Sequence, residues 1–197
     1  FNVNFFVHEP PVPDAAREHF LGAVDRALHV SVPFNPIVME RTVEPILVYG
    51  YPLGSSMGLV AALEWLGQPY RLARVRMPDD MLTERYARLN GRQETPALIT
   101  TDGRVVTETV AIALWLEARD KERRISFASG SIEADRLHQF VAFLNSGFTA
   151  AFSGLWVALE MARPDPDYQA ALRRFGRQQV GSRHRKLETM MRDTPYL

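Results

Sequence analysis

Two adjacent serines, Ser55 and Ser56, offer hydroxyl groups between a short apolar segment and a longer one. Residues 46–49 are typical of a buried strand, and residues 57–66, which stop at Gly67, are typical of a helix. The serines would then lie at a helix N-terminus, where unpaired backbone N–H groups and a partial positive charge favour an anion such as a thiolate or carboxylate. A simple helix cap is the commoner use of such a pair, so both interpretations remain open.

A second candidate is the run Glu94-Thr95-Pro96, which precedes an expected strand. The proline holds Thr95 in an extended conformation. If the Thr95–Pro96 bond is cis, the Thr95 N–H and C=O could face a ligand and pair with a peptide backbone. The sequence does not decide the isomer, because only about 5–6 % of X–Pro bonds in folded proteins are cis.

A third candidate is Glu108-Thr109, at the expected start of another helix. A glutamate at this position complements the helix dipole, which is a sufficient structural reason for it. As a site, Glu108 would pair with a ligand ammonium group while the Thr109 hydroxyl and nearby N–H groups bind a carboxylate. The pair would thus recognise the head group of an α-amino acid.

The chain contains no cysteine. This excludes disulfides, thiolate metal sites and a CxxC redox couple. Any thiol chemistry must therefore use a thiol that arrives on the ligand, and no metal is expected.

The overall composition is that of an ordinary globular protein of 197 residues, with 46 % hydrophobic and 23 % charged residues. The formal net charge is zero, so no global field attracts nucleic acid or an anionic membrane. No apolar run suggests a membrane span, and the N-terminus does not look like a secretory signal. We therefore expect a cytoplasmic protein, with processing or truncation ahead of Phe1 left open.

Strand and helix patterns alternate through residues 46–123, which we expect to form one domain. Strands are predicted over 46–49, 71–76 and the hairpin 97–107, whose turn is Asp102-Gly103. A helix capped by Thr107 or Thr109 should follow, through Leu116. The order predicts a mixed sheet with a crossover helix and an antiparallel edge.

The remaining sequence has helical patterns only. In residues 1–45, Asp14 resembles an N-cap for an apolar stripe over residues 16–28, so this region is expected to be an arm or short helix packed on the main body. Residues 128–197 are expected to form a helical domain: one long helix begins at Ser131 and a second runs over about 167–191. The residues of this second helix that we expect to face inward are Tyr168, Leu172, Phe175, Leu187 and Met191.

In combination, these motifs resemble the N-terminal domain of cytosolic glutathione S-transferases over residues 46–119. The elements that carry the resemblance are the helix ending Leu66-Gly67, Thr95-Pro96-Ala97-Leu98, Asp102-Gly103 and Thr107-Glu108-Thr109-Val110-Ala111-Ile112. The resemblance implies an α/β domain of thioredoxin-like fold followed by an all-α domain, usually in a homodimer. It also implies that glutathione, as co-substrate, binds along Glu94, Thr95, Pro96, Glu108 and Thr109.

Three departures qualify the resemblance. Glu94 replaces a common glutamine, and its carboxylate would meet the glycyl end of glutathione unfavourably unless it points away. Serine-type bacterial relatives read Ser-Gly-Asn-Ser through the turn; Gly54 and Ser56 match this motif, but Leu53 stands where their catalytic serine lies. The helical domain is shorter than usual, so either the chain is a fragment or the helix near residues 15–28 substitutes for missing packing.

The activating residue is therefore open. Cysteine-type relatives place their cysteine at Ser55, and relatives that use asparagine place it there too. Ser55 is our first candidate, Ser56 the second and Tyr51 the third. The expected reaction is attack of glutathione thiolate on a small hydrophobic electrophile or a peroxide. Candidate pocket residues for that substrate are Leu53, Phe148, Phe152, Trp156 and Tyr168, and the alternative is a non-catalytic interaction module of the same fold.

Overall fold

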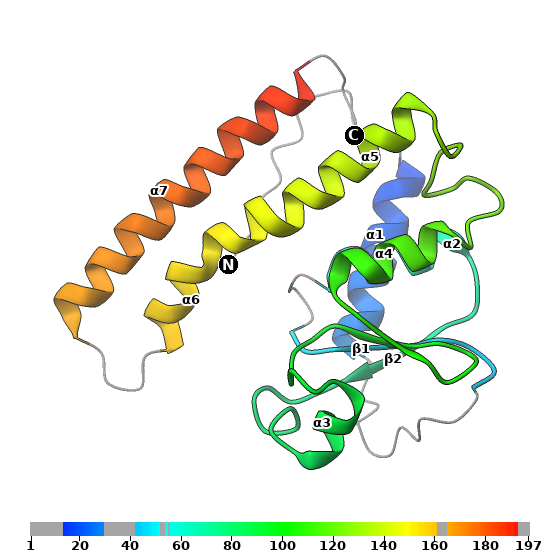
Figure 1. Cartoon of the computed structure of the whole chain (residues 1–197), viewed down its shortest axis with the longest axis horizontal. Coiled ribbons are helices and arrows are strands. Elements are labelled where there is room, and N and C mark those ends of the chain that lie inside the picture. The colour runs from blue at the N-terminus through cyan, green and yellow to red at the C-terminus, as the bar shows by residue number, and fades with distance from the viewer. Residues whose placement is uncertain (1–13, 30–41, 52–53, 55, 161–164, 193–197) are drawn as a thin grey trace. The chain divides into compact units, whose positions relative to one another are not determined.

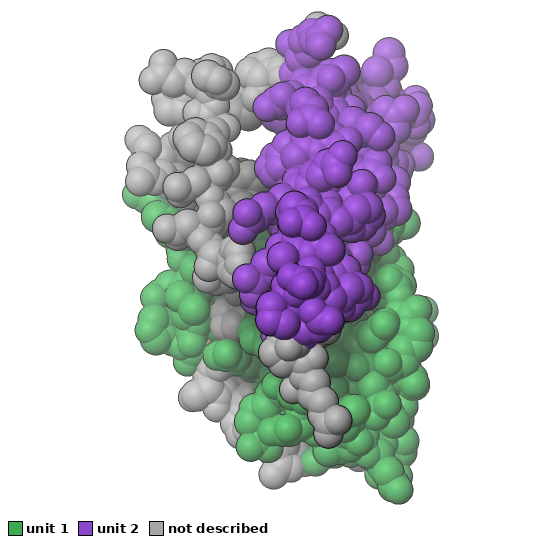
Figure 2. Space-filling model, turned by 90° about the vertical axis from the view of Figure 1, so that its left-hand side faces the viewer, with its two compact units in different colours: residues 1–126 green, residues 127–197 purple. Residues whose placement is uncertain are grey.

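The computed structural model describes residues 14–29, 42–51, 54, 56–160 and 165–192. The chain divides into two compact units between Ser126 and Phe127 (Figures 1 and 2). The first unit contains the sheet, and the second is helical.

A four-stranded mixed sheet forms the centre of the first unit, with the order β2-β1-β3-β4. The strands are β1 (Ile46–Tyr49), β2 (Arg71–Arg74), β3 (Ala97–Ile99) and β4 (Val105–Thr107). β1 pairs with β2 in parallel and with β3 in antiparallel fashion, and β3 and β4 form the expected hairpin. The turn residue Gly103 has φ +84°, a conformation that glycine adopts without steric cost. The predicted mixed sheet and antiparallel edge are confirmed.

Helices cover both faces of this sheet. Leu47, Tyr49 and Leu98 face a core shared with α2 (Met57–Leu66) and α4 (Thr109–Glu117). The alternate residues Val48, Ala97 and Ile99 face a second core. That core is completed by Tyr86 and Leu89 of α3 (Glu84–Leu89). Because successive strand residues point to opposite faces, β1 and β3 are buried on both sides, as the apolar sequence of residues 46–49 predicted for β1.

The predicted end of α2 is confirmed, whereas the predicted cap of α4 is wrong. Gly67 follows α2 with φ +63°, the left-handed conformation expected for a glycine that ends a helix. Neither Thr107 nor Thr109 caps α4. Glu108 occupies the N-cap position without a side-chain hydrogen bond to the helix, because Thr107 is still paired with Ala97 in the sheet.

The helix expected near residues 15–28 is α1 (Asp14–His29), which packs against α2. Ala27 is fully buried, and its carbonyl oxygen accepts a hydrogen bond from the Tyr49 hydroxyl at 2.7 Å. Arg26 forms an ion pair with Glu64, which also accepts a hydrogen bond from Tyr70. α1 thus joins the sheet core through both an apolar contact and polar ones.

The second unit contains two long helical runs (Figure 1). The first starts with α5 (Ile132–Ala142), continues as a π-helical segment (Phe143–Phe148) and a 3₁₀ segment (Thr149–Phe152), and ends with α6 (Ser153–Glu160). As predicted, Ser131 caps it by accepting a hydrogen bond from the Ala134 N–H at 3.1 Å. The second run is α7 (Pro166–Met191), capped by Asp165.

Two residues of α7 that we expected to face inward are instead exposed: Tyr168 by 52 % and Phe175 by 55 %. The reason lies at Gly176, which is buried against Leu155 of α6 and leaves no room for a Cβ atom there. Gly154 likewise lies close to the backbone of α7. Since the two helices approach each other through glycine, the contact face of α7 includes Gly176 and turns the Phe175 side chain toward solvent.

Contrary to the sequence expectation, the helical run Ile132–Leu159 is long and apolar enough to cross a membrane by length and composition. Its most apolar 18-residue window has a mean hydropathy of 1.4, and 11 % of that window is buried inside the structure. A single such helix is weak evidence, because core helices of soluble proteins meet the same criterion.

Candidate functional site

The candidate residues in the first unit gather at one end of the sheet. Ala97 pairs with Thr107 at the open end of the β3–β4 hairpin, so Thr95-Pro96 and Glu108-Thr109 extend from the same end of the sheet. Val48 of β1 pairs with Ala97 on the other side of β3, which brings the turn after β1 to that end of the sheet as well. A Cβ placed on Gly50 would lie 3.4 Å from the Thr95 hydroxyl oxygen and would collide with Met77. Three motifs far apart in the sequence therefore converge.

Glu108 has an unusual backbone conformation for a residue other than glycine, with φ +74°. Such conformations occur in only a few per cent of non-glycine residues and are enriched at functional sites. The Glu108 carbonyl oxygen accepts the hydrogen bond from the Ile112 N–H at 2.9 Å, while its side chain makes no cap. The first N–H groups of α4 consequently keep their capacity to bind an anion beside Thr109.

The Thr95–Pro96 peptide bond is cis, the isomer on which our expectation for this motif depended. Pro96 is buried and Thr95 is partly exposed. Within the described part of the chain, no hydrogen bond is made by the main-chain N–H or C=O of Thr95. The Thr95 N–H and C=O groups therefore have no hydrogen-bond partner among the described residues, at the end of the sheet where the three motifs converge.

The peptide preceding this motif is held by two buried side chains that we did not predict. The Tyr86 hydroxyl and the Asn90 side-chain amide both donate to the Glu94 carbonyl oxygen, at 2.7 and 2.8 Å. Burial raises the pKa of Tyr86 to about 12, so the phenol stays protonated, and remains a donor, well into the alkaline range. The only sign of this contact in the sequence is Asn90, which directly follows the apolar Leu89. A polar side chain that becomes buried needs hydrogen-bond partners.

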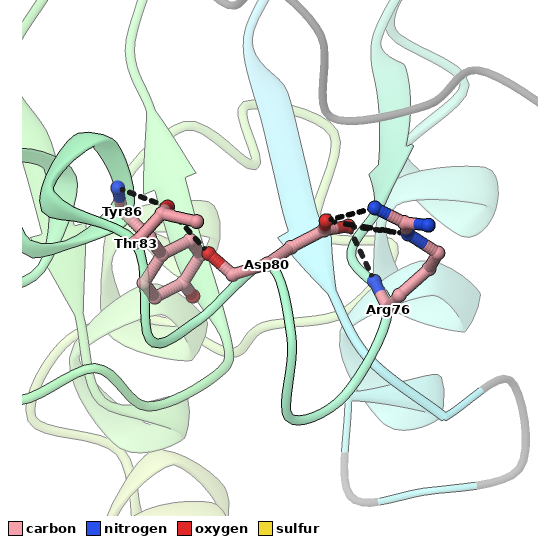
Figure 3. A network of polar contacts seen from close by, with 4 residues as sticks. All are labelled: Arg76, Asp80, Thr83 and Tyr86. Carbon is pink, nitrogen blue, oxygen red and sulfur yellow. Dashed lines mark hydrogen bonds and ion pairs between the residues drawn. The ribbon is translucent and has the colours of Figure 1, made fainter.

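A polar network on the segment between β2 and α3 places Tyr86 (Figure 3). Arg76 binds the Asp80 carboxylate through its main-chain N–H at 2.7 Å and its guanidinium at 2.9 Å. These hydrogen bonds hold the pKa of Asp80 below its usual range. The Thr83 hydroxyl donates to the Asp80 carbonyl oxygen and accepts from the Tyr86 N–H, capping α3. The network thus fixes the helix that carries Tyr86.

The turn after β1 holds the candidates for thiol activation, and the structure describes only part of it. Ser55 and Leu53 lie outside the described residues. Ser56 is 4 % exposed and its side chain does not cap α2. Tyr51 is more than half exposed. The choice among Ser55, Ser56 and Tyr51 therefore stays a prediction, and Ser56 is the less accessible of the two described hydroxyls.

The candidate residues for a second substrate lie in the second unit, apart from Leu53. Phe148 contacts Phe152 edge to face, with ring centroids 5.6 Å apart, and contacts His184 at 4.9 Å. Trp156 and Tyr168 are about half exposed. Phe148 ends the π-helical segment, a feature that often occurs at functional sites. In the described residues of both units, no group of three or more His, Asp or Glu side chains is placed to hold a metal ion.

Comparison with known proteins agrees with this geometry. Residues 56–119 match the family model described as "Glutathione S-transferase, N-terminal domain". No curated protein matches the chain. Among solved structures, the glutathione transferase URE2P6 from Phanerochaete chrysosporium, in complex with oxidized glutathione, is 21 % identical with a TM-score of 0.66; the match covers 78 % of this chain and 70 % of that one.

Two bacterial structures are similar to a comparable extent. A glutathione S-transferase from Xylella fastidiosa is 21 % identical with a TM-score of 0.64, covering 76 % of this chain and 71 % of its own. BphK, a bacterial glutathione transferase solved as a ternary complex, is 24 % identical with a TM-score of 0.61, covering 77 % and 72 %. At these identities the structures show the fold: a thioredoxin-like sheet domain followed by a helical part. With the family match, they support the resemblance to glutathione transferases.

Proposed function

We propose that this protein is a glutathione transferase that binds glutathione at the end of the sheet where the three motifs converge, and that it activates the glutathione thiol. The observation that carries the proposal is the β3–β4 register, which brings Thr95-Pro96 and Glu108-Thr109 to one edge beside the turn after β1. Family match and fold support the same assignment.

Each end of glutathione has a chemically matched partner in this arrangement. The Glu108 carboxylate binds the γ-glutamyl ammonium, and the Thr109 hydroxyl with the first N–H groups of α4 binds the neighbouring carboxylate. The Thr95 main chain pairs with the cysteinyl unit through its N–H and C=O groups. Glu94 and Pro96 flank Thr95 on either side of this contact. The sulfur then lies toward the turn that leads into α2.

Activation of the thiol requires only hydrogen-bond donors at that turn. The N-terminus of α2 and the Ser55 hydroxyl donate to the sulfur and stabilise the thiolate, lowering the pKa of the thiol by about 2 units. At about 1.4 kcal/mol per unit, one or two hydrogen bonds to a charged group, worth roughly 1.5–3 kcal/mol each, are sufficient. The thiolate then attacks an electrophilic carbon, from which a leaving group such as chloride departs with the bonding electrons, or a peroxide oxygen, in which case the O–O bond breaks and the other oxygen leaves as hydroxide or alkoxide.

The finer assignments rest on the resemblance. We propose a bacterial-type, serine-like enzyme that acts on small hydrophobic electrophiles in detoxification, in the cytoplasm and as a homodimer. Phe148, Phe152, Trp156 and Tyr168 are the candidates to contact the second substrate.

A non-catalytic interaction module of the same fold is the second candidate function. Leu53 stands where serine-type relatives place their catalytic serine, and Glu94 replaces their glutamine. The burial of Ser56 also favours this alternative, because a covered hydroxyl does not reach a ligand sulfur without a change in the turn.

A conjugation assay with glutathione and a chloronitrobenzene separates the two functions, with a peroxidase assay beside it. The transferase should show turnover that depends on both substrates. Absence of conjugation and of peroxidase activity at high protein concentration, with glutathione still bound, would identify the interaction module.

A further inference from the structure

Met77 follows the end of β2 and lies beside the turn after β1. A Cβ atom placed on the buried Gly50 would collide with the Sδ and Cγ atoms of Met77. The same Cβ position lies 3.4 Å from the Thr95 hydroxyl oxygen. The Met77 sulfur and the Thr95 hydroxyl are therefore neighbours, at the end of the sheet toward which the glutathione sulfur is proposed to point.

The Met77 thioether is also open to solvent. Met77 is 38 % exposed, the largest exposed fraction of any methionine in the described residues, whereas Met57 is 7 % exposed. A thioether is a soft nucleophile, and oxidants convert it to a sulfoxide. Because burial shields a thioether from an oxidant, Met77 is the described methionine that a peroxide reaches most readily.

A peroxide that enters the proposed site as second substrate meets two sulfur atoms, the glutathione thiolate and the Met77 thioether. When the thioether attacks the peroxide oxygen that carries a hydrogen, an S–O bond forms and the O–O bond breaks. The other oxygen leaves as hydroxide or alkoxide and takes the proton from the new S–OH group. The products are a sulfoxide and water or an alcohol: the sulfur loses two electrons and the peroxide gains them.

The new oxygen atom has little choice of position. On the Gly50 side there is no free space, because the thioether already fills the place of a Cβ atom. Near the sulfur lies the Thr95 hydroxyl, which, like the Thr95 N–H, has no hydrogen-bond partner among the described residues. A sulfoxide is polar where the thioether is only a weak acceptor, so it competes for these donors.

We propose that Met77 is a site of oxidative modification that closes the glutathione site. Its sulfoxide accepts a hydrogen bond from Thr95 and displaces the cysteinyl unit of glutathione, so that peroxide in excess over glutathione switches the protein off. The inference rests on the proposed function, because it presumes that glutathione binds beside Thr95.

The first test is stepwise treatment of the intact protein with hydrogen peroxide in the absence of glutathione. Peptide mass spectrometry should show oxygen gained at Met77 before the other described methionines, which are Met57, Met81, Met190 and Met191. Calorimetric titration of the same samples should show glutathione affinity falling about tenfold in step with the Met77 sulfoxide. Oxidation of one of the other four ahead of Met77, or Met77 sulfoxide without loss of affinity, would overturn the proposal.

Two leucine variants separate this sulfoxide from other oxidative damage. Met77→Leu keeps an apolar side chain of similar volume without sulfur, so its glutathione affinity should be the same before and after peroxide. Met81→Leu is the matched control, because Met81 is partly buried against the core on the α3 face. This control should lose affinity after peroxide as the wild type does. An equal loss in Met77→Leu would contradict the assignment to Met77.

Met77→Gln provides a test without peroxide. Its side-chain carbonyl oxygen imitates the sulfoxide oxygen, so this variant should bind glutathione about tenfold more weakly than Met77→Leu. Equal affinities of the two variants would rule out competition for Thr95 and overturn the proposal. Thermal unfolding of each variant checks that it is folded.

The two proposals fail in different ways. If the reduced wild-type protein does not bind glutathione, the proposed function is wrong and the inference falls with it. If the reduced protein binds glutathione and the protein oxidised at Met77 binds it equally well, only the role of Met77 is wrong.

Discussion

The Tyr86 hydroxyl donates a hydrogen bond to the Glu94 main-chain carbonyl oxygen over 2.7 Å. Tyr86 is fully buried, in the core on the α3 face of the sheet. The bond thus connects that core directly to the residue before Thr95-Pro96. Tyr86 acts in the proposed site as a positioning residue, without ligand contact of its own.

We expect Tyr86→Phe to lower the free energy of unfolding by about 1 kcal/mol, the usual value of one hydrogen bond, and to weaken glutathione binding. Urea unfolding and calorimetric titration measure the two effects. Tyr49→Phe is the matched control, because Tyr49 also donates from a buried position to a carbonyl oxygen at 2.7 Å, that of Ala27. This control should be destabilised to a similar extent with unchanged glutathione affinity; equal affinity losses in both variants would contradict the positioning role.

Tyr86 also predicts a loss of stability at alkaline pH. Burial raises its pKa in the folded protein to about 12, while the unfolded chain ionises near 10. The unfolded state therefore releases its proton first, so the stabilisation is complete below pH 10 and is lost as the pH rises from about 10 to 12. Urea unfolding across this range should show a shallower decline for Tyr86→Phe than for wild type. Parallel declines would show that Tyr86 ionises normally.

Glu108→Gln should raise the KM for glutathione about tenfold with little change in kcat, because the lost interaction holds the ligand ammonium equally in the ground and transition states. Steady-state kinetics at varied glutathione gives both constants. Glu84→Gln is a suitable control, since Glu84 is exposed in the first turn of α3, a position comparable to Glu108 in charge and helix location. An unchanged KM for glutathione in Glu108→Gln would show that Glu108 does not belong to the glutathione-binding site.

Ser55→Ala should lower kcat about tenfold or more and leave glutathione binding nearly unchanged, because the hydroxyl acts on the thiolate. The pKa of bound glutathione thiol, followed by thiolate absorbance, should rise in this variant. Ser56→Ala and Tyr51→Phe provide the comparison. If one of these two reduces kcat and Ser55→Ala does not, the assignment moves to that residue.

The glycine contact between α6 and α7 gives a stability prediction for the second unit. Gly176→Ala should lower the free energy of unfolding by about 1–3 kcal/mol, because its Cβ would collide with Leu155. Gly181→Ala in the same helix meets only the end of the Arg185 side chain, at 3.7 Å. It should instead stabilise the protein by about 0.5–1 kcal/mol through helix propensity. Chemical unfolding of both variants distinguishes the effect of close packing between α6 and α7 from the general effect of replacing a helical glycine by alanine.

The sequence predicted the sheet and its main helices because their signals are local. The apolar strand 46–49, the helix ending at Gly67 and the Asp102-Gly103 hairpin each depend on neighbouring residues. A shared site for Thr95 and Glu108 was expected only from the resemblance, and the β3–β4 register that brings the two motifs together is a finding of the structure.

The errors arose where contacts between distant residues decide the outcome. Phe175 was expected inside from its apolar character, but the Gly176 contact with Leu155 sets the face of α7. Thr107 was expected to cap α4, but its pairing with Ala97 continues the strand. Tyr86 was not identified, because a tyrosine on a helix gains such a contact only from the partner that the fold brings to it.

Titration of the intact protein with glutathione tests the central claim most directly. We expect binding at one site per chain, with a Kd between about 1 μM and 1 mM, that weakens in Glu108→Gln and persists in Glu84→Gln. No binding of glutathione at concentrations up to about 10 mM, far above that range, would contradict the account.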